Sequence, residues 1–113
     1  AALLTSSLKL GAMSAGATDK KVQHLEEFGQ CTGLAFQVID DILDVTQSSK
    51  TLGKSAGKDE AVNKATYPAI HGLDKSRRLA EKLTKQAINA LKPFKSKGKR
   101  LEELANYLLD REY

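Results

Sequence analysis

Three aspartates near the middle of the chain form the pattern best suited to chemistry. Asp40, Asp41 and Asp44 lie in the segment 36–44, which reads Phe-Gln-Val-Ile-Asp-Asp-Ile-Leu-Asp. At about 100° per residue of α-helix, Asp44 lies about 40°, Gln37 about 60° and Asp41 about 100° from Asp40. The side chains between them are apolar and lie outside that arc. The spacing predicts a largely buried helix that carries one narrow acidic stripe.

This acidic stripe has no basic neighbour along the chain. Residues 22–49 contain five acidic residues and no Lys or Arg, so their local charge is −5. Adjacent carboxylates repel one another, and burial raises that cost. Oxygen ligands without His or Cys favour Mg²⁺, with Mn²⁺ as the alternative. Because Mg²⁺ usually completes its shell with water and phosphate oxygens, the stripe predicts a phosphorylated ligand.

A polar, lysine-rich segment follows the predicted acidic helix. It runs from about residue 47 to residue 64 and contains Lys54, Lys58 and Lys64. Lysine serves phosphate as a point charge, so this segment supplies the charge that a phosphorylated ligand requires. A stripe that merely faces solvent is the competing interpretation. The apolar surroundings, the absence of cationic partners one turn away and the glycine–lysine segment argue against it.

Composition favours an all-α chain and excludes several kinds of site. The 113 residues are 41% hydrophobic and 28% charged, with two Pro and no Trp. Helical periodicity predicts helices over 2–12, 18–47, 67–71, 73–91 and 99–109. Thr18 is the predicted N-cap of the second, Gly72 and Lys92-Pro93 are predicted helix ends, and Gly29 and Gly33 inside the second helix indicate tight packing or a bend. One Cys excludes a disulfide framework and a four-cysteine zinc site, and two His are too few for a histidine metal cluster. The sequence contains no run of eighteen apolar residues, so it predicts no membrane span.

The net charge of +4 is spread unevenly. Residues 1–49 hold three Lys against six acidic residues, which gives −3, and residues 73–113 hold eleven Lys or Arg against six, which gives +5. The basic residues alternate with Glu and apolar residues, which is typical of a solvated helix face. We therefore expect no nucleic-acid partner.

The ordered series of motifs resembles the trans-isoprenyl diphosphate synthases, or polyprenyl synthetases, and most closely their geranylgeranyl diphosphate synthase group. The resemblance extends over nearly the whole chain. It is carried by Phe36-Gln37, the second aspartate-rich motif Asp40-Asp41-Ile42-Leu43-Asp44, Leu52-Gly53-Lys54-Ser55-Ala56-Gly57-Lys58-Asp59 and Lys64-Ala65-Thr66-Tyr67-Pro68.

The resemblance implies an isoprenoid-synthase bundle of long helices around a deep cavity. It implies a homodimeric prenyltransferase that condenses isopentenyl diphosphate with an allylic diphosphate to make a short-chain (C15–C20) product. In that family the counterparts of Asp40, Asp41 and Asp44 hold Mg²⁺ against the allylic diphosphate. The counterpart of Lys54 contacts the same diphosphate, and we extend that role to Lys64.

Two further residues are expected beside the bound substrate. The family counterpart of Gln37 lies next to the diphosphate. Phe36, together with Ile39 and Leu43, belongs to faces that would line a dry, apolar channel for the allylic cation.

The resemblance also predicts that the chain is a portion of a longer protein. A complete synthase is more than twice as long and carries a first aspartate-rich motif upstream, and Met13 is the only Met here. We therefore expect residues 1–113 to form the C-terminal portion of a single synthase domain, inactive by itself. The alternatives are a non-catalytic regulatory subunit and a class I terpene cyclase. The expected location is the cytoplasm, or a plastid if a transit peptide has been lost.

Overall fold

The computed structural model of the chain describes residues 2–51 and 66–111, with side chains described for 2–47 and 66–111. These residues form helices and no strand, which confirms the predicted all-α class. In chain order the elements are α1 (Ala2–Ser14), α2 (Asp19–Thr51), α4 (Tyr67–His71), α5 (Leu73–Ala90), the 3₁₀-helix η1 (Lys92–Gly98) and α6 (Lys99–Asp110).

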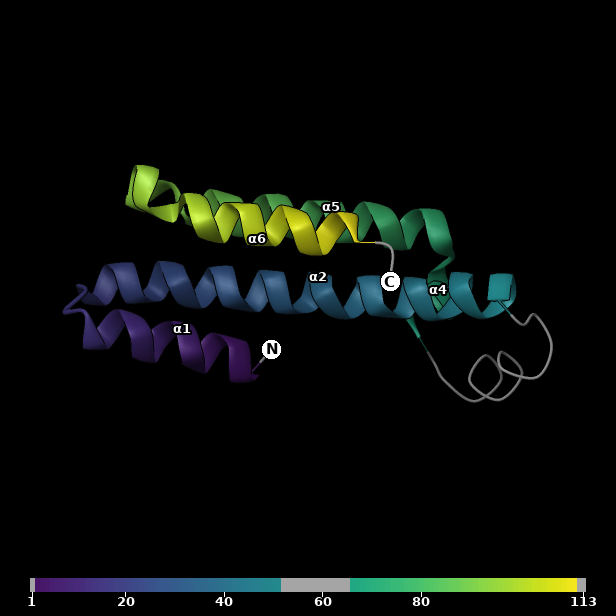
Figure 1. Ribbon diagram of the computed structural model, residues 1–113, viewed down its shortest axis with the longest axis horizontal. Helices are drawn as coiled ribbons and strands as arrows, with labels where there is room; N and C mark the ends of the chain where they lie inside the picture. Colours follow the sequence, from purple (N-terminus) through teal and green to yellow (C-terminus); the bar gives the residue numbers. More distant parts are fainter. Residues whose placement is uncertain (1, 52–65, 112–113) are drawn as a thin grey trace.

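The long helix α2 is the centre of the arrangement. Helix α1 lies along its first half on one side, and α5 and α6 lie along the other side (Figure 1). The chain reverses direction between α1 and α2 and again between α5 and α6, so consecutive long helices are antiparallel (Figure 1). No described helix is both long and apolar enough to cross a membrane.

Helix α2 begins where its sequence predicts and ends later than predicted. The Lys21 backbone N–H donates to Thr18 Oγ1 at 3.3 Å, which is the predicted N-cap. Asp19 lies in the first turn, where the helix dipole favours a negative charge. The helix continues to Thr51, so the prediction that it ends near residue 47 was wrong by about one turn. Residues 52–64 of the predicted lysine-rich segment lie outside the described residues.

Helices α1 and α2 approach closely at Gly29. A Cβ atom at this position would lie 2.9 Å from Thr5 Oγ1 and 3.1 Å from Thr5 Cα. Only a residue without a side chain fits such an approach. Lys9 Nζ and Glu26 Oε2 form an ion pair across the same pair of helices, with 3.4 Å between them.

Small residues on α5 and α6 allow those helices to pack closely on α2. Phe28 of α2 is 1% exposed, and the alanines facing it on α5 and α6 are almost completely buried. Leu8, Val22, Phe94 and Leu101 pack around this group. The core it forms comprises Ala12, Leu25, Phe28, Ala87, Ala90, Leu91 and Ala105.

Two short turns set the direction of α5 and α6. Gly72 has φ 91°, a conformation that favours glycine, and its N–H donates to the Pro68 carbonyl at 2.8 Å between α4 and α5. Lys92-Pro93 ends α5 as predicted, but the chain then forms η1, which the sequence did not predict. Lys95 inside η1 has φ 54° and ψ −131°. This turn brings α6 back along α2 (Figure 1).

Candidate active site

The acidic stripe is held in place by a second apolar cluster on α2. Val38, Ile39 and Ile42 are each less than 9% exposed and pack with Ala80 of α5. Leu109 of α6 packs against the same cluster. Because these side chains occupy the face of α2 toward α5 and α6, the rotation of the helix is fixed and the aspartates are directed elsewhere.

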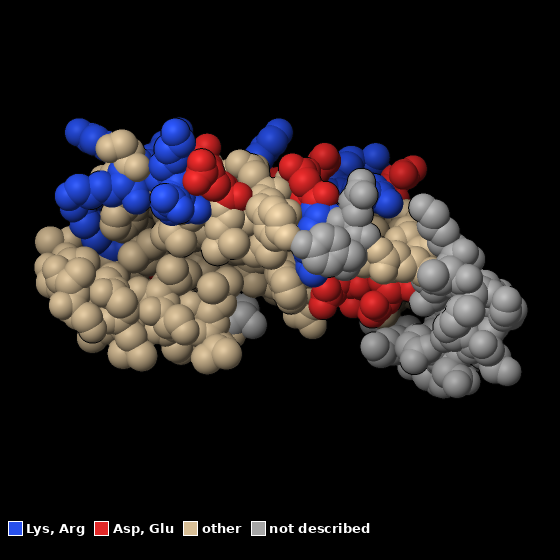
Figure 2. All heavy atoms as spheres, in the orientation of Figure 1, with Lys and Arg blue, Asp and Glu red and all other residues tan. Residues whose placement is uncertain are grey.

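The structure places the predicted acidic residues at the surface of the described chain. Asp40, Asp44 and Gln37 are exposed, and Asp41 is half-buried. Acidic atoms are visible along the lower edge of the molecule in the half that contains the end of α2 (Figure 2). The stripe is therefore accessible to a ligand from outside these helices.

An arginine from the opposite end of the chain reaches the stripe. Arg111 Nη2 lies 2.6 Å from Asp40 Oδ1, and the Arg111 side chain is 12% exposed whereas that of Asp40 is 52% exposed. The contact arises because Leu109 packs α6 against α2, after which the backbone becomes extended at Arg111 (φ −67°, ψ 153°). Arg111 was not among the predicted site residues. A signal for it was present in the sequence: a cation directly after the last helix, which runs antiparallel to α5 and so returns the chain to the middle of α2 (Figure 1).

Phe36 belongs to this cluster of interactions. The Arg111 guanidinium carbon lies 4.3 Å from the centroid of the Phe36 ring, which is a cation–π distance. Phe36 precedes Asp40 by one helical turn, so one guanidinium contacts both side chains. Phe36 is nevertheless 38% exposed and Leu34 is 51% exposed. The prediction of a largely buried segment therefore holds for Val38, Ile39 and Ile42 but was wrong for Leu34 and Phe36, because α1 covers only the first half of α2 (Figure 1).

The other predicted channel residues have a different surrounding. Ile39 is 5% exposed and lies inside the cluster between α2 and α5, with Leu43 packed against that cluster. In the described part of the chain these two side chains stabilise helix packing. Lys54 and Lys64 lie outside the described residues.

The donor set fits a hard divalent cation with few protein ligands. Carboxylates one turn apart, at Asp40 and Asp44, supply the oxygen atoms that such ions prefer. Within the described ranges, no group of three or more His, Cys, Asp or Glu side chains converges on one point. Two carboxylates suffice for Mg²⁺, which fills its remaining positions with water and phosphate oxygens.

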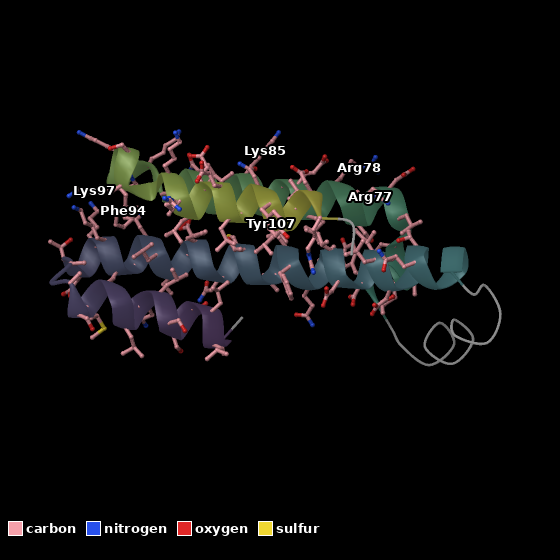
Figure 3. The ribbon with its side chains drawn as sticks, in the orientation of Figure 1. Arg77, Arg78, Lys85, Phe94, Lys97 and Tyr107 are labelled. Carbon is pink, nitrogen blue, oxygen red and sulfur yellow. The ribbon has the colours of Figure 1, made fainter. Side chains whose placement is uncertain are left out.

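Two further features lie outside this cluster. Cys31 is half-buried, with its Sγ 4.0 Å from Gln86 Oε1, and burial together with the nearby charge of Glu27 raises the pKa of its thiol. A shallow hollow of about 600 Å³ lies on the outer side of α5 and includes none of the predicted site residues. Arg78 and Lys85, two of the residues lining it, project away from α2 (Figure 3).

Known proteins resemble this chain over nearly all of its length. A chloroplastic geranylgeranyl pyrophosphate synthase of Catharanthus roseus is 51% identical over 113 residues, which cover 99% of this chain and 32% of that protein. The large subunit of a chloroplastic heterodimeric geranylgeranyl pyrophosphate synthase of Arabidopsis thaliana is 53% identical over 113 residues, which cover 99% of this chain and 30% of that protein. The chain thus spans about a third of the length of these relatives.

The fold agrees with a solved structure. A crystal structure of a protein assigned as a farnesyl-diphosphate synthase in Marinomonas sp. MED121 superposes with a TM-score of 0.78 at 37% identity, over 96% of this chain and 35% of that protein. The helices therefore form part of an isoprenoid-synthase fold. The family described as Polyprenyl synthetase matches residues 1–108, and this chain belongs to that family.

Proposed function

We propose that this chain supplies the diphosphate-binding second aspartate motif of a short-chain trans-prenyltransferase. The substrates are isopentenyl diphosphate and an allylic diphosphate, and the product is a C15–C20 isoprenyl diphosphate. Support comes from family membership and from relatives named as geranylgeranyl pyrophosphate synthases at about half identity. One structural observation carries the proposal: exposed Asp40 and Asp44, with half-buried Asp41, lie on a helix whose opposite face packs into a core.

Each residue of the stripe has a role in this proposal. Prenyl synthases generally depend on a divalent metal, and Asp40, Asp41 and Asp44 are the residues that would hold it, as Mg²⁺ or Mn²⁺. When bound, the metal neutralises charge on the diphosphate as that group departs. Asp40 and Asp44 orient the diphosphate toward α2, and Gln37 lies on the same surface as a hydrogen-bonding group.

The apolar and basic residues complete the proposed site. Phe36 presents an aromatic face beside Asp40, where a developing allylic cation would be stabilised in a dry site. Lys54 and Lys64 are proposed diphosphate contacts on the basis of the family motif. Lysine at those positions would neutralise further phosphate charge.

The context of the chain is also part of the proposal. We assign residues 1–113 to the C-terminal portion of one synthase domain, because they correspond to about a third of the relatives' length. We propose a homodimer, and a plastid location because both relatives described above are chloroplastic.

A chimera tests the proposed activity. This chain would replace the matching 113 residues of the Catharanthus roseus synthase, and the purified chimera would be supplied with isopentenyl diphosphate, an allylic diphosphate and Mg²⁺. We expect C15–C20 products that disappear when the metal is chelated. A folded chimera that makes no product would indicate a regulatory subunit, and one that makes cyclic hydrocarbons would indicate a terpene cyclase; either result refutes the proposal. The 113-residue chain by itself should make no product.

A further inference from the structure

One end of the molecule concentrates positive charge. The turn between α1 and α2 and the helix η1 lie together at this end (Figure 1), and basic atoms gather there (Figure 2). We call this surface the basic end. Its cations are all exposed and comprise Lys20, Lys21, Lys92, Lys95, Lys97, Lys99 and Arg100.

The charge of the basic end is not neutralised within the described residues. The two ion pairs in the described ranges, Lys9–Glu26 and Arg111–Asp40, lie elsewhere, and none of the seven cations takes part in them. The neighbouring acidic residues are Asp19, Glu102 and Glu103, so the local net charge is seven minus three, or +4. This equals the net charge of the entire chain. Such a surface attracts an anionic partner.

The backbone of η1 holds a lysine outward at a conformational cost. Lys95 has φ 54° and ψ −131°, a region that non-glycine residues seldom occupy. Next to it, Phe94 points into the core beside α2, and Lys21 Nζ lies 5.9 Å from its ring (Figure 3). Lys97 projects away from the helices (Figure 3). The turn is therefore anchored by an apolar side chain and presents lysines to solvent.

From these observations we infer that the basic end binds an anionic membrane surface. Six of its seven cations are Lys, a point charge suited to a diffuse layer of lipid phosphates rather than to bidentate recognition of nucleic-acid bases. The partly buried ring of Phe94 packs against the core rather than presenting its face for base stacking. Met13, 60% exposed, and Leu10, 64% exposed, lie on α1 near the same end and offer apolar contact with a bilayer.

This surface is separate from the acidic stripe. Lys20 and Asp40 are twenty residues apart on α2, which is about 30 Å along a helix. The inference does not rest on the proposed reaction, and vesicle binding is measured without substrate. A failure of vesicle binding would refute this inference without contradicting the proposed prenyltransferase activity.

Vesicle co-sedimentation tests the inference. The chain would be mixed with vesicles of phosphatidylcholine, or of phosphatidylcholine and phosphatidylglycerol in equal amounts. We expect binding to the anionic vesicles, weakened by added salt, and little binding to the neutral ones. Replacing Lys95, Lys97 and Lys99 together by Gln should weaken it about a hundredfold, since each lysine at the surface contributes about fivefold.

A charge-matched control separates the basic end from net charge. Replacing Lys75, Lys82 and Lys85 of α5 by Gln removes the same charge elsewhere and should weaken binding only severalfold. Lys95→Gly relieves the backbone conformation while removing one charge, so it should weaken binding about fivefold without lowering the melting temperature.

Three results would overturn the inference. The first is an equal loss of binding in the two triple variants. The second is equal binding of the unmodified chain to neutral and anionic vesicles. The third is tighter binding to duplex DNA than to anionic vesicles at the same salt, which would assign the surface to nucleic acid.

Discussion

Arg111 and Asp40 form an ion pair although 71 positions separate them, with 2.6 Å between Nη2 and Oδ1. The acidic stripe lacks any cation nearby in sequence, and the fold provides one from the end of α6. The same guanidinium lies over Phe36. In the proposed active site, Arg111 is therefore paired with the Asp40 carboxylate, which a divalent cation would also bind.

A double-mutant cycle should measure the coupling between Arg111 and Asp40. Because half of the Asp40 side chain is exposed, we expect a coupling free energy of about 0.5–1 kcal/mol. The experiment compares urea unfolding of the unmodified chain, Arg111→Ala, Asp40→Ala and the double variant. Additive effects of the two single changes would show that the ion pair does not form in solution.

Removal of Arg111 should strengthen divalent-cation binding at the stripe. With its competitor absent, Asp40 is free to bind the ion, and Arg111→Gln should lower the Kd for Mn²⁺ about fivefold. Free Mn²⁺ counted by electron paramagnetic resonance, with inorganic diphosphate present, gives the Kd. Arg100→Gln removes the same charge from the start of α6 and serves as the control. Equal effects of the two substitutions would contradict competition at Asp40.

Gly29→Ala should destabilise the chain. The new Cβ would lie 2.9 Å from Thr5 Oγ1, and the overpacking should outweigh the gain in helix propensity, leaving a loss of about 1–2 kcal/mol in unfolding free energy. Gly11→Ala meets no atom within 4 Å, so it should stabilise the chain. The unfolding free energies of both variants are measured by urea denaturation. A Gly29→Ala variant as stable as the Gly11→Ala variant would show that the close approach of α1 and α2 is wrong.

Cys31 should make stability depend on alkaline pH. Burial, and secondarily the charge of Glu27, raises the pKa of the thiol above its ordinary value of 9.0. The unfolded chain therefore loses this proton at lower pH than the folded chain, so the stabilisation is present below pH 9 and falls as pH rises above it. The unfolding free energy measured in urea should therefore fall less steeply with rising pH in Cys31→Ala than in the unmodified chain. Identical pH profiles would contradict a raised pKa.

Local sequence signals predicted the helices and one contact between them. The apolar period of α2, the Thr18 cap and the Gly72 turn depend on neighbours in sequence, and all appear in the structure. Gly29 inside a helix predicted tight packing or a bend, and the close approach of Thr5 shows tight packing there. These features could be predicted because their energies come from the residues within a few turns.

Features that depend on distant packing could not be predicted in the same way. The Arg111–Asp40 contact requires the positions of both α2 and α6. The exposure of Leu34 and Phe36 depends on how far α1 extends along α2, which periodicity does not reveal. The positive φ of Lys95 occurs at a residue type that gives no local signal for it. The metal-binding roles of the three aspartates stay predictions.

The central claim is that Asp40 acts in ionisation of the allylic diphosphate, and one kinetic comparison tests it most directly. In the chimera with the Catharanthus roseus synthase, kcat/KM would be measured for Asp40→Asn and for Asp74→Asn, a matched change at an exposed residue of α5. We predict a loss of about a hundredfold or more for Asp40→Asn and no change for Asp74→Asn. A folded Asp40→Asn chimera with an unchanged kcat/KM would contradict the claim.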